Sequence, residues 1–392
     1  MSTLKVNKIE NTATTDGGIE IDNTGHVQID GLQLPTTGAL SNRNKIINGD
    51  MRIDQRNAGS AVTVNTGPKT YTLDRWHANA QSSDGVFTVE RSTTAPDSFT
   101  NSLLVTVTTA DSSITSDQYY LLCQRIEGYN VADLDLGKST AKSFTLSFWV
   151  RSSVTGTFSG SFENSAENRV YPYTYSISAA DTWEQKTITV AGDTSGTWLT
   201  DNGIGLFVWF DLGTGTNKRG TAGSWADTSG GTYGVTGSTS LISTNGATFY
   251  ITGVQLEVGS VATPFEHRSY GDELARCQRY YQERTYAGGG IVTTGISWSP
   301  NDATCNIPTN SKMRAAPTVE LPTAGTGSNR LAFLTTGGSY PTTIGTHSAT
   351  SISDTNITIY AASYAGLTDD GPSWVYAGST GGSITFKFSA EL

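Results

Sequence analysis

ATPFEHRSYGDELARCQRYYQER, residues 262–284, is the stretch around which the chain divides, because it holds the one convincing helical pattern in a sequence of short alternating segments. Four residues recur at the i, i+4, i+7 and i+11 spacing of one helix face: Tyr270, Leu274, Cys277 and Tyr281. Ser269, followed three residues later by Asp272, resembles a helix N-cap, and the glycines at 288–290 would stop the helix. We predict a connecting helix over 269–284 whose stripe packs on the β-sandwich before it, on the β-domain after it, or against copies of itself.

The remaining composition is that of an all-β protein. Among 392 residues, 43 are glycine, 15% are charged and 36% are hydrophobic, which matches strands joined by tight turns and argues against disorder. The length is sufficient for two or three domains, each with its own core.

Strand patterns recur from residue 44 to residue 268. The clearest are at 102–109, 119–127, 143–153, 183–190, 203–212 and 247–259, with weaker ones at 86–92 and 156–165. Six or more such runs predict an antiparallel two-sheet β-sandwich, most simply a jelly roll. A second set of short strands over 285–392 predicts a distal C-terminal β-domain, closed by a last strand with Ile384, Phe386 and Phe388 on one face.

The first 43 residues form short alternating segments broken by glycines. Strands of four or five residues with one small apolar face cannot bury a core alone, so this segment needs neighbours, and three intertwined copies would supply them. The alternative is an unstructured N-terminal arm.

Three stretches carry a resemblance to a known family: GVQLEVGSVATPFEHRSYGDELARCQRYYQ (253–282), NKIINGDMRIDQRNAG (44–59) and YTLDRW (71–76). They resemble modules of bacteriophage tail fibres and related virion appendages, over about 44–284. The sandwich also resembles jelly-roll carbohydrate-binding modules. The resemblance implies a homotrimeric fibre that joins other virion tail proteins through residues 1–43 and binds a host cell-surface polysaccharide or lipopolysaccharide.

The loop 213–240 is the leading candidate for carbohydrate contact. It is rich in Gly, Thr and Ser and carries two aromatic residues beside polar and charged side chains: Trp225, Tyr233, Asp227, Arg219, Asn217 and Lys218. Long loops of this kind tend to be functional, and exposed aromatic rings can stack on sugar rings. Trp225 could equally anchor the loop on the sheet.

Secondary candidates lie elsewhere. Tyr171, Tyr173 and Tyr175 alternate and therefore share one face of a strand, where they form either a platform or part of the packing. In the C-terminal domain, Trp374 is a candidate for receptor contact, with core or intersubunit packing as the alternative.

Charge and motifs exclude several function classes. The formal net charge is −10 with no basic cluster, so neither nucleic acid nor an anionic membrane surface is an expected partner. Three widely spaced cysteines favour buried thiols over a disulfide, and no metal-ligand spacing or cofactor motif appears. Neither a signal peptide nor an apolar run of membrane-spanning length is present, so we expect synthesis in the host cytoplasm without a signal for export. The tail-fibre resemblance implies that the chain is then assembled into a virion.

Three functions compete. The first is a fibre that binds glycan without cleaving it, and the second is a purely structural baseplate, neck or head component. The third is a polysaccharide depolymerase, which needs a pair of carboxylates that no motif reveals, so we expect no enzymatic activity.

Overall fold

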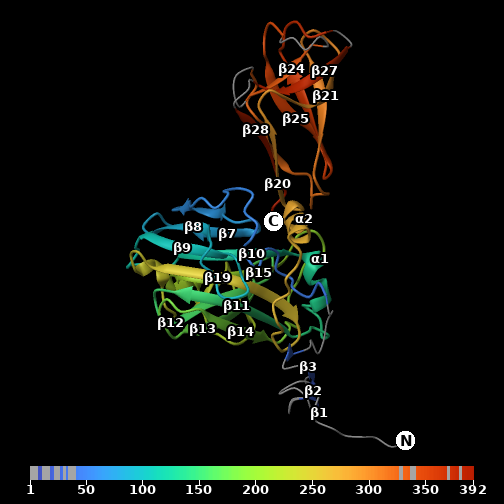
Figure 1. Cartoon of the computed structure of the whole chain (residues 1–392). Helices are drawn as coiled ribbons and strands as arrows, with labels where there is room; N and C mark the ends of the chain where they lie inside the picture. Colours follow the sequence, from blue (N-terminus) through green and yellow to red (C-terminus); the bar gives the residue numbers. More distant parts are fainter. Residues whose placement is uncertain are drawn as a thin grey trace, which may run out of the picture. The chain divides into compact units, whose positions relative to one another are not determined.

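The computed structural model describes residues 8–10, 18–21, 27–29, 32–33, 41–325, 330–335, 341–368, 371–378 and 382–392 (Figure 1). The chain divides into two compact units, residues 1–270 with Leu392, and residues 271–391. The described residues form six sheets, in which almost all strand pairs are antiparallel. The all-β prediction is therefore confirmed.

A small four-stranded meander opens the first unit. Its strands are β1 (Lys8–Glu10), β2 (Gly18–Ile21), β3 (Val27–Ile29) and β4 (Leu32–Gln33), paired in sequence order. Ile9 lies opposite Ile19, and Ile19 lies opposite Ile29, so the three side chains share one face. The predicted strands of the N-terminal segment are thus present where the segment is described, and its other positions up to residue 40 lie outside the described residues.

The rest of the first unit is a jelly-roll β-sandwich. One sheet has the order β17 (Ala226–Asp227), β13 (Arg169–Ile177), β12 (Gly156–Glu163), β15 (Ile204–Thr214), β10 (Tyr119–Glu127), β7 (Trp76–Ala80) and β6 (Gly67–Tyr71). The other has the order β14 (Glu184–Val190), β11 (Phe144–Ser152), β19 (Thr248–Val258), β9 (Ser102–Thr109), β8 (Val86–Ser92) and β5 (Val62–Val64). All eight predicted strand regions coincide with observed strands.

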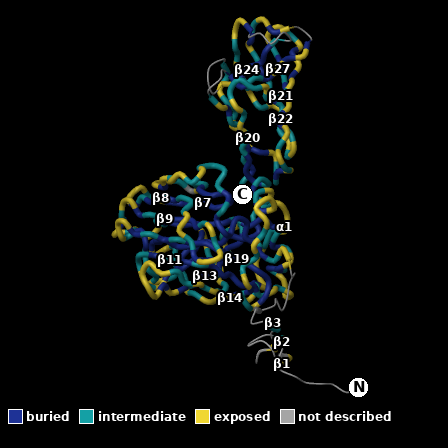
Figure 2. The backbone as a smooth tube through the Cα atoms, in the orientation of Figure 1, coloured by how far each residue is buried: buried dark blue, intermediate teal, exposed yellow. Residues whose placement is uncertain are grey.

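Alternation along each strand builds the core between the two sheets. On β15, Leu206, Val208 and Phe210 are fully buried in it, while Phe207 and Trp209 face the opposite side of the seven-stranded sheet. Figure 2 shows the sandwich strands largely buried and the exposed residues gathered in turns and loops. Short helices complete the unit: α1 (Gly128–Val131), η1 (Ala132–Leu134), η2 (Thr216–Lys218) and η3 (Leu241–Ser243).

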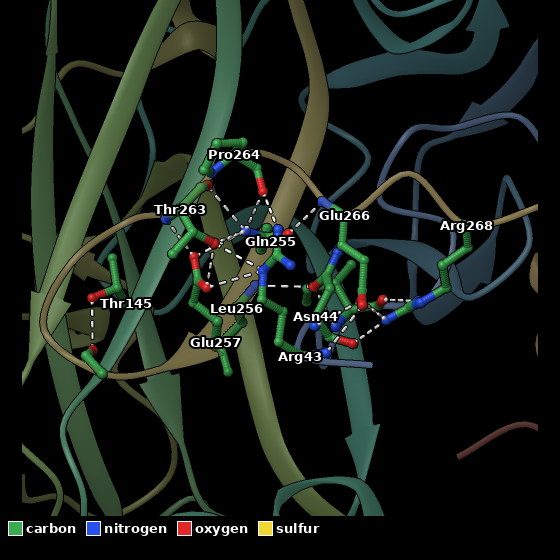
Figure 3. A network of polar contacts seen from close by, with 12 residues as sticks. Arg43, Asn44, Thr145, Gln255, Leu256, Glu257, Thr263, Pro264, Glu266 and Arg268 are labelled. Carbon is green, nitrogen blue, oxygen red and sulfur yellow. Dashed lines mark hydrogen bonds and ion pairs between the residues drawn. The ribbon is translucent and has the colours of Figure 1, made fainter. Parts of the chain in front are cut away.

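A network of polar contacts joins the two ends of the sandwich segment (Figure 3). Asn44 Oδ1 accepts the backbone N–H of Leu256 at 3.1 Å, and Arg43 Nε donates to Thr263 Oγ1 at 2.8 Å. Buried Glu257 accepts the Thr263 hydroxyl at 2.7 Å, and the Arg268 guanidinium donates to Ile46 O at 3.1 Å. We call residues 43–46 and 254–268 the clamp. Apart from Arg43, these residues lie within the stretches 44–59 and 253–282 quoted above.

The helix α2 covers Tyr270–Gln278, so the prediction of a helix here is confirmed but its predicted length, 269–284, is wrong. Tyr281 belongs instead to strand β20 (Tyr281–Ala287), which pairs with β28 (Ser383–Ser389). That ladder satisfies the backbone of Tyr281 and the residues after it, and overrides the helical spacing. Tyr270 is exposed, Leu274 is partly buried and Cys277 is buried, so the four predicted residues do not form one continuous stripe.

The second unit holds a three-stranded and a six-stranded sheet. The first has the order β20, β28 and β23 (Thr318–Glu320). The second has the order β24 (Leu331–Leu334), β27 (Gly371–Ala377), β21 (Gly290–Ser297), β22 (Ala303–Pro308), β26 (Asn356–Ala362) and β25 (Thr346–Ile352). Both sheets contribute to one core, in which Ile384, Phe386 and Phe388 are buried as predicted. No helix in the described part of the chain is long and apolar enough for a membrane span.

Candidate functional site

The loop 213–240 is more ordered than its composition suggests. It contains η2 and three two-residue strands, β16 (Arg219–Gly220), β17 and β18 (Gly234–Val235). β17 extends the seven-stranded sheet by pairing with β13, and β16 pairs in parallel with β18. The sheet edge thus fixes the position of the residues around Trp225.

Trp225 lies between two other aromatic residues, and the three form what we call the aromatic trio. Its ring centroid is 5.3 Å from that of Tyr171 and 5.4 Å from that of Trp198, both in edge-to-face arrangements. The indole Nε1 donates to Ala191 O at 2.7 Å. All three side chains are partly buried against the sandwich core, so each keeps part of its surface in solvent. Trp225 is therefore anchored and also partly accessible.

Arg169 binds two acidic side chains, one of which, Asp227, belongs to the loop that carries Trp225. Its guanidinium donates to both oxygens of buried Asp193, at 2.8 and 2.6 Å, and to Asp227 Oδ1 at 2.9 Å. The hydrogen bonds to Asp193 are the largest cause of a pKa of Arg169 above its ordinary value. The Asp227 side chain is 87% exposed. The Asp227 carboxylate, which Arg169 holds in place, therefore faces solvent two residues along the chain from Trp225.

Tyr233 does not share this surface. It is buried, its hydroxyl donates to Glu167 Oε2 at 3.0 Å, and its ring packs edge-to-face on Trp209 and Tyr119. Lys218, which lies over the Tyr233 ring, donates to Gly230 O at 2.6 Å. Tyr233 anchors the loop, and its ring faces are taken up by protein contacts.

The two other polar candidates are also placed apart. Asn217 is exposed and its Nδ2 donates to Asp117 Oδ1 at 3.0 Å. Arg219 is partly buried, with Nε donating to Thr214 Oγ1 at 3.3 Å. Of the residues predicted from the loop, the structure brings only Trp225 and Asp227 into one partly exposed group.

The three alternating tyrosines of β13 share one face, as predicted, and that face points into the sandwich. Tyr173 is buried and its hydroxyl donates to Trp209 O at 2.8 Å, while buried Tyr175 packs edge-to-face on Phe148. A Cβ at Gly160 would lie 2.5 Å from the Tyr173 hydroxyl, which explains a glycine in the middle of β12. Packing accounts for Tyr173 and Tyr175, and only Tyr171 reaches the surface.

Two acids lie buried on the outer face of the seven-stranded sheet, where the loop covers them. Glu163 accepts the Trp209 indole N–H at 3.1 Å and the Thr232 backbone N–H at 2.6 Å. Burial raises the pKa of Glu163 to about 8. Asp211 accepts the Ser159 hydroxyl at 2.8 Å, and burial raises its pKa to about 6. No motif marks either acid, since the strand pattern shows only that they alternate with core residues.

Trp198 was also not singled out by sequence reasoning. It lies in a loop with Gly, Thr and Ser neighbours, the same composition that drew attention to Trp225. Trp374 lies on β27 of the second unit and is considered below. Within the described ranges, no three His, Cys, Asp or Glu side chains are grouped so that they could hold a metal ion.

No protein-family model matches the sequence, and no curated protein matches it. Several solved structures show limited similarity. The enzymatically active domain of tailspike protein 4 of bacteriophage CBA120 is 15% identical, with a TM-score of 0.30, over 55% of this chain and 21% of that one. A putative sugar binding protein from Bacteroides thetaiotaomicron is 15% identical, with a TM-score of 0.35, over 55% and 100%. A family 11 carbohydrate-binding module from Clostridium thermocellum is 13% identical, with a TM-score of 0.27, over 54% and 99%.

Proposed function

We propose that the chain is a virion fibre subunit that binds a host cell-surface polysaccharide or lipopolysaccharide without cleaving it, and that the aromatic trio makes part of that contact. The virion assignment rests on the resemblance of residues 44–59, 71–76 and 253–282 to tail-fibre modules. The carbohydrate assignment rests on one observation, the partly exposed group formed by Tyr171, Trp198 and Trp225 beside exposed Asp227.

The chemistry of the group suits a carbohydrate. A sugar ring presents C–H groups on its faces and hydroxyls around its edge. The aromatic trio offers ring surface on which the C–H groups can pack, and the exposed Asp227 carboxylate can accept hydrogen bonds from the sugar hydroxyls. By analogy with bases stacked on aromatic rings, each stacked ring should contribute about 1 to 3 kcal/mol.

Anchoring and binding are compatible roles for Trp225. The hydrogen bond from its Nε1 to Ala191 O and its contacts with Tyr171 and Trp198 fix the ring in one orientation before any ligand arrives. A ring that is already ordered loses little rotamer freedom on binding, which favours affinity.

The oligomeric part of the proposal is a homotrimer that contacts other virion proteins through residues 1–43. It is supported by the meander β1–β4, where Ile9, Ile19, Ile21 and Ile29 are each at least 40% exposed. An isoleucine-rich sheet face of this kind gains stability when copies of the chain cover it.

A glycan array followed by a monovalent binding measurement tests the function. Trp225→Ala and Trp198→Ala should each weaken binding to the best array oligosaccharide by about ten-fold to a hundred-fold. The matched control is Trp183→Ala, because Trp183 is also partly buried but packs on Tyr250. Binding to whole host cells should fall less, since several sites on a repetitive surface add avidity.

Other outcomes would support other functions. Full affinity in a normally folded Trp225→Ala removes the trio from the site. No binding to any array member favours the structural virion component. Release of reducing sugar from a bound polysaccharide would establish a depolymerase.

A further inference from the structure

The outer face of the six-stranded sheet in the second unit lies on the side opposite the core. On β22 and β26 the inward side chains, such as Cys305 and Ile359, are buried in the core. The alternate residues Thr304, Asn306 and Tyr360 therefore project from the opposite side. We call that side the β21–β22 face.

Large apolar side chains are exposed on this face. Ile296 is 60% exposed, Trp298 44% and Trp374 40%. Strand register places them among hydroxyl-bearing neighbours: Trp374 lies opposite Thr294, and Thr304 lies between Ile296 and Tyr360. The face thus alternates apolar and polar side chains across adjacent strands, and several of its rings lie open to solvent.

One pair of rings is held rigidly. Trp298 and Tyr360 stack with centroids 5.8 Å apart and planes 12° from parallel. The Tyr360 hydroxyl donates to Asp302 Oδ1 at 2.8 Å, and the Ser299 hydroxyl donates to Asp302 Oδ2 at 2.9 Å. These bonds fix the pair, so its surface is ordered before a ligand binds.

A pocket of about 320 Å³ opens over β21 and β22. Its lining consists of short, mostly polar groups: Thr293, Thr294, Gly295, Ile296, Thr304, Cys305 and Asn306. Asn306 Oδ1 accepts hydrogen bonds from Asn356 Nδ2 at 3.1 Å and Thr358 Oγ1 at 2.8 Å, so the amide is held in place. The pocket offers hydroxyl and amide groups in fixed positions.

The six strands of this sheet contain no Asp, Glu, Lys or Arg. An anionic or cationic ligand would find no opposite charge on them, so an uncharged ligand fits the face best. Trp374 on β27 and Tyr360 on β26 are three strand spacings apart, about 14 Å, with the pocket between them. A ligand that reaches both must be an extended molecule.

We propose that the β21–β22 face binds a neutral oligosaccharide, with Trp374 and the Trp298–Tyr360 pair as two stacking platforms on either side of the pocket. Rings that stack and short polar groups that hydrogen-bond are what a chain of uncharged sugars requires. A second copy of the chain fits less well, because it would have to satisfy the threonine and asparagine groups between the rings. The inference shares the carbohydrate class with the proposed function but depends on different residues in a different unit.

The test uses the full chain and a panel of neutral hexasaccharides with gluco, manno and galacto configuration, measured by titration calorimetry. Trp374→Ala should weaken binding of the best panel member by about ten-fold to a hundred-fold. Thr294→Arg, at an exposed position, should block the pocket and have a similar effect without touching the core. The matched control is Tyr129→Ala, which removes an aromatic ring that is 61% exposed in the first unit.

Specific outcomes would overturn the inference. One is wild-type affinity in both Trp374→Ala and Thr294→Arg, and another is no binding of any panel member by the unmodified chain at millimolar concentration. A lower molar mass of Trp374→Ala in light scattering would show that a second copy covers the face. Loss of binding in Trp225→Ala but not in Thr294→Arg would overturn this inference and leave the proposed function standing. The reverse result would support this inference and contradict the role of the trio.

Discussion

The backbone N–H of Asn44 donates to Glu266 Oε2 at 3.1 Å, although the two residues are 222 positions apart in the sequence. The same carboxylate accepts the Arg43 backbone N–H at 3.3 Å and the Arg268 guanidinium at 3.1 Å (Figure 3). The segment before the first strand of the sandwich and the segment after its last strand are therefore fastened to each other. The clamp thus gives Asn44, Glu266 and Arg268 a structural role at the two ends of the sandwich.

Asn44→Ala should destabilise the sandwich strongly. Asn44 is buried, its Oδ1 accepts the backbone N–H groups of Ile46 and Leu256, and its Nδ2 donates to Val254 O. Truncation leaves these buried groups without their partner, so we expect a loss of about 2 to 4 kcal/mol in the free energy of unfolding. Urea unfolding of the purified chain measures it.

The matched control is Asn217→Ala, because exposed Asn217 makes a hydrogen bond to the Asp117 side chain at the surface. Its effect should stay within about 0.5 kcal/mol. Equal unfolding midpoints for the two variants would show that the clamp does not limit stability.

Glu163 should make the sandwich less stable as the pH rises from 6.5 to 8. The pKa of Glu163 is about 8 in the folded chain, whereas its ordinary value, which applies to the unfolded chain, is 4.5. Between pH 6.5 and 8 the folded chain therefore holds a proton that the unfolded chain has released. The contribution of protonated Glu163 to the free energy of unfolding is fully present below pH 4.5. It is lost by about 1.4 kcal/mol for each pH unit as the pH rises toward the folded-state pKa of about 8.

The chosen range separates Glu163 from its neighbours. Asp211, with a pKa of about 6, contributes mainly at lower pH. His77, whose pKa burial lowers, contributes with the opposite sign while the unfolded imidazole still holds a proton, and this contribution fades within about one pH unit above 6.5. Glu163→Gln should remove most of the slope in the free energy of unfolding between pH 6.5 and 8. An unchanged slope in that variant would assign the pH dependence to another group.

The three cysteines should be unreactive in the native chain. Cys123, Cys277 and Cys305 are free and buried, and burial raises the pKa of Cys123 well above its ordinary value and that of Cys305 to about 12. We expect no reaction with a thiol reagent at pH 8 over minutes, and three equivalents per chain in denaturant without reductant. Fewer than three would reveal a disulfide, and rapid native reaction would place a thiol at the surface.

The sequence predicted the bounds of individual strands well, but it did not predict which residues from distant segments pack together. The bounds of β9 and β10 match their alternating patterns, because alternation is set by neighbours along one strand. Trp225 and Tyr233 were grouped because they share a loop, yet Trp225 packs on Tyr171 and Trp198 while Tyr233 packs on Trp209. Such contacts depend on which strands pair, and no single segment encodes that pairing.

The end of α2 illustrates the same limit. Tyr281 has the spacing of a helical stripe, but it pairs with Ser389, which lies more than a hundred residues away. Tertiary pairing therefore decided between helix and strand where the local pattern permitted either.

The last prediction concerns the isoleucine face of the meander β1–β4. Ile9, Ile19 and Ile29 lie side by side on one face, while Lys8 and Glu20 form an ion pair on the other. Full burial of one such side chain contributes about 1.5 to 3 kcal/mol, so three copies that cover each other's faces would gain substantially. Light scattering at micromolar concentration should give the mass of three chains. Ile19→Lys should lower that mass, because a lysine charge buried between copies is costly. Gln28→Lys, placed opposite Glu20 on the polar face, should leave the mass unchanged and serves as the matched control. A wild-type chain with the mass of a monomer would contradict the trimer and leave the isoleucine face without an intersubunit role.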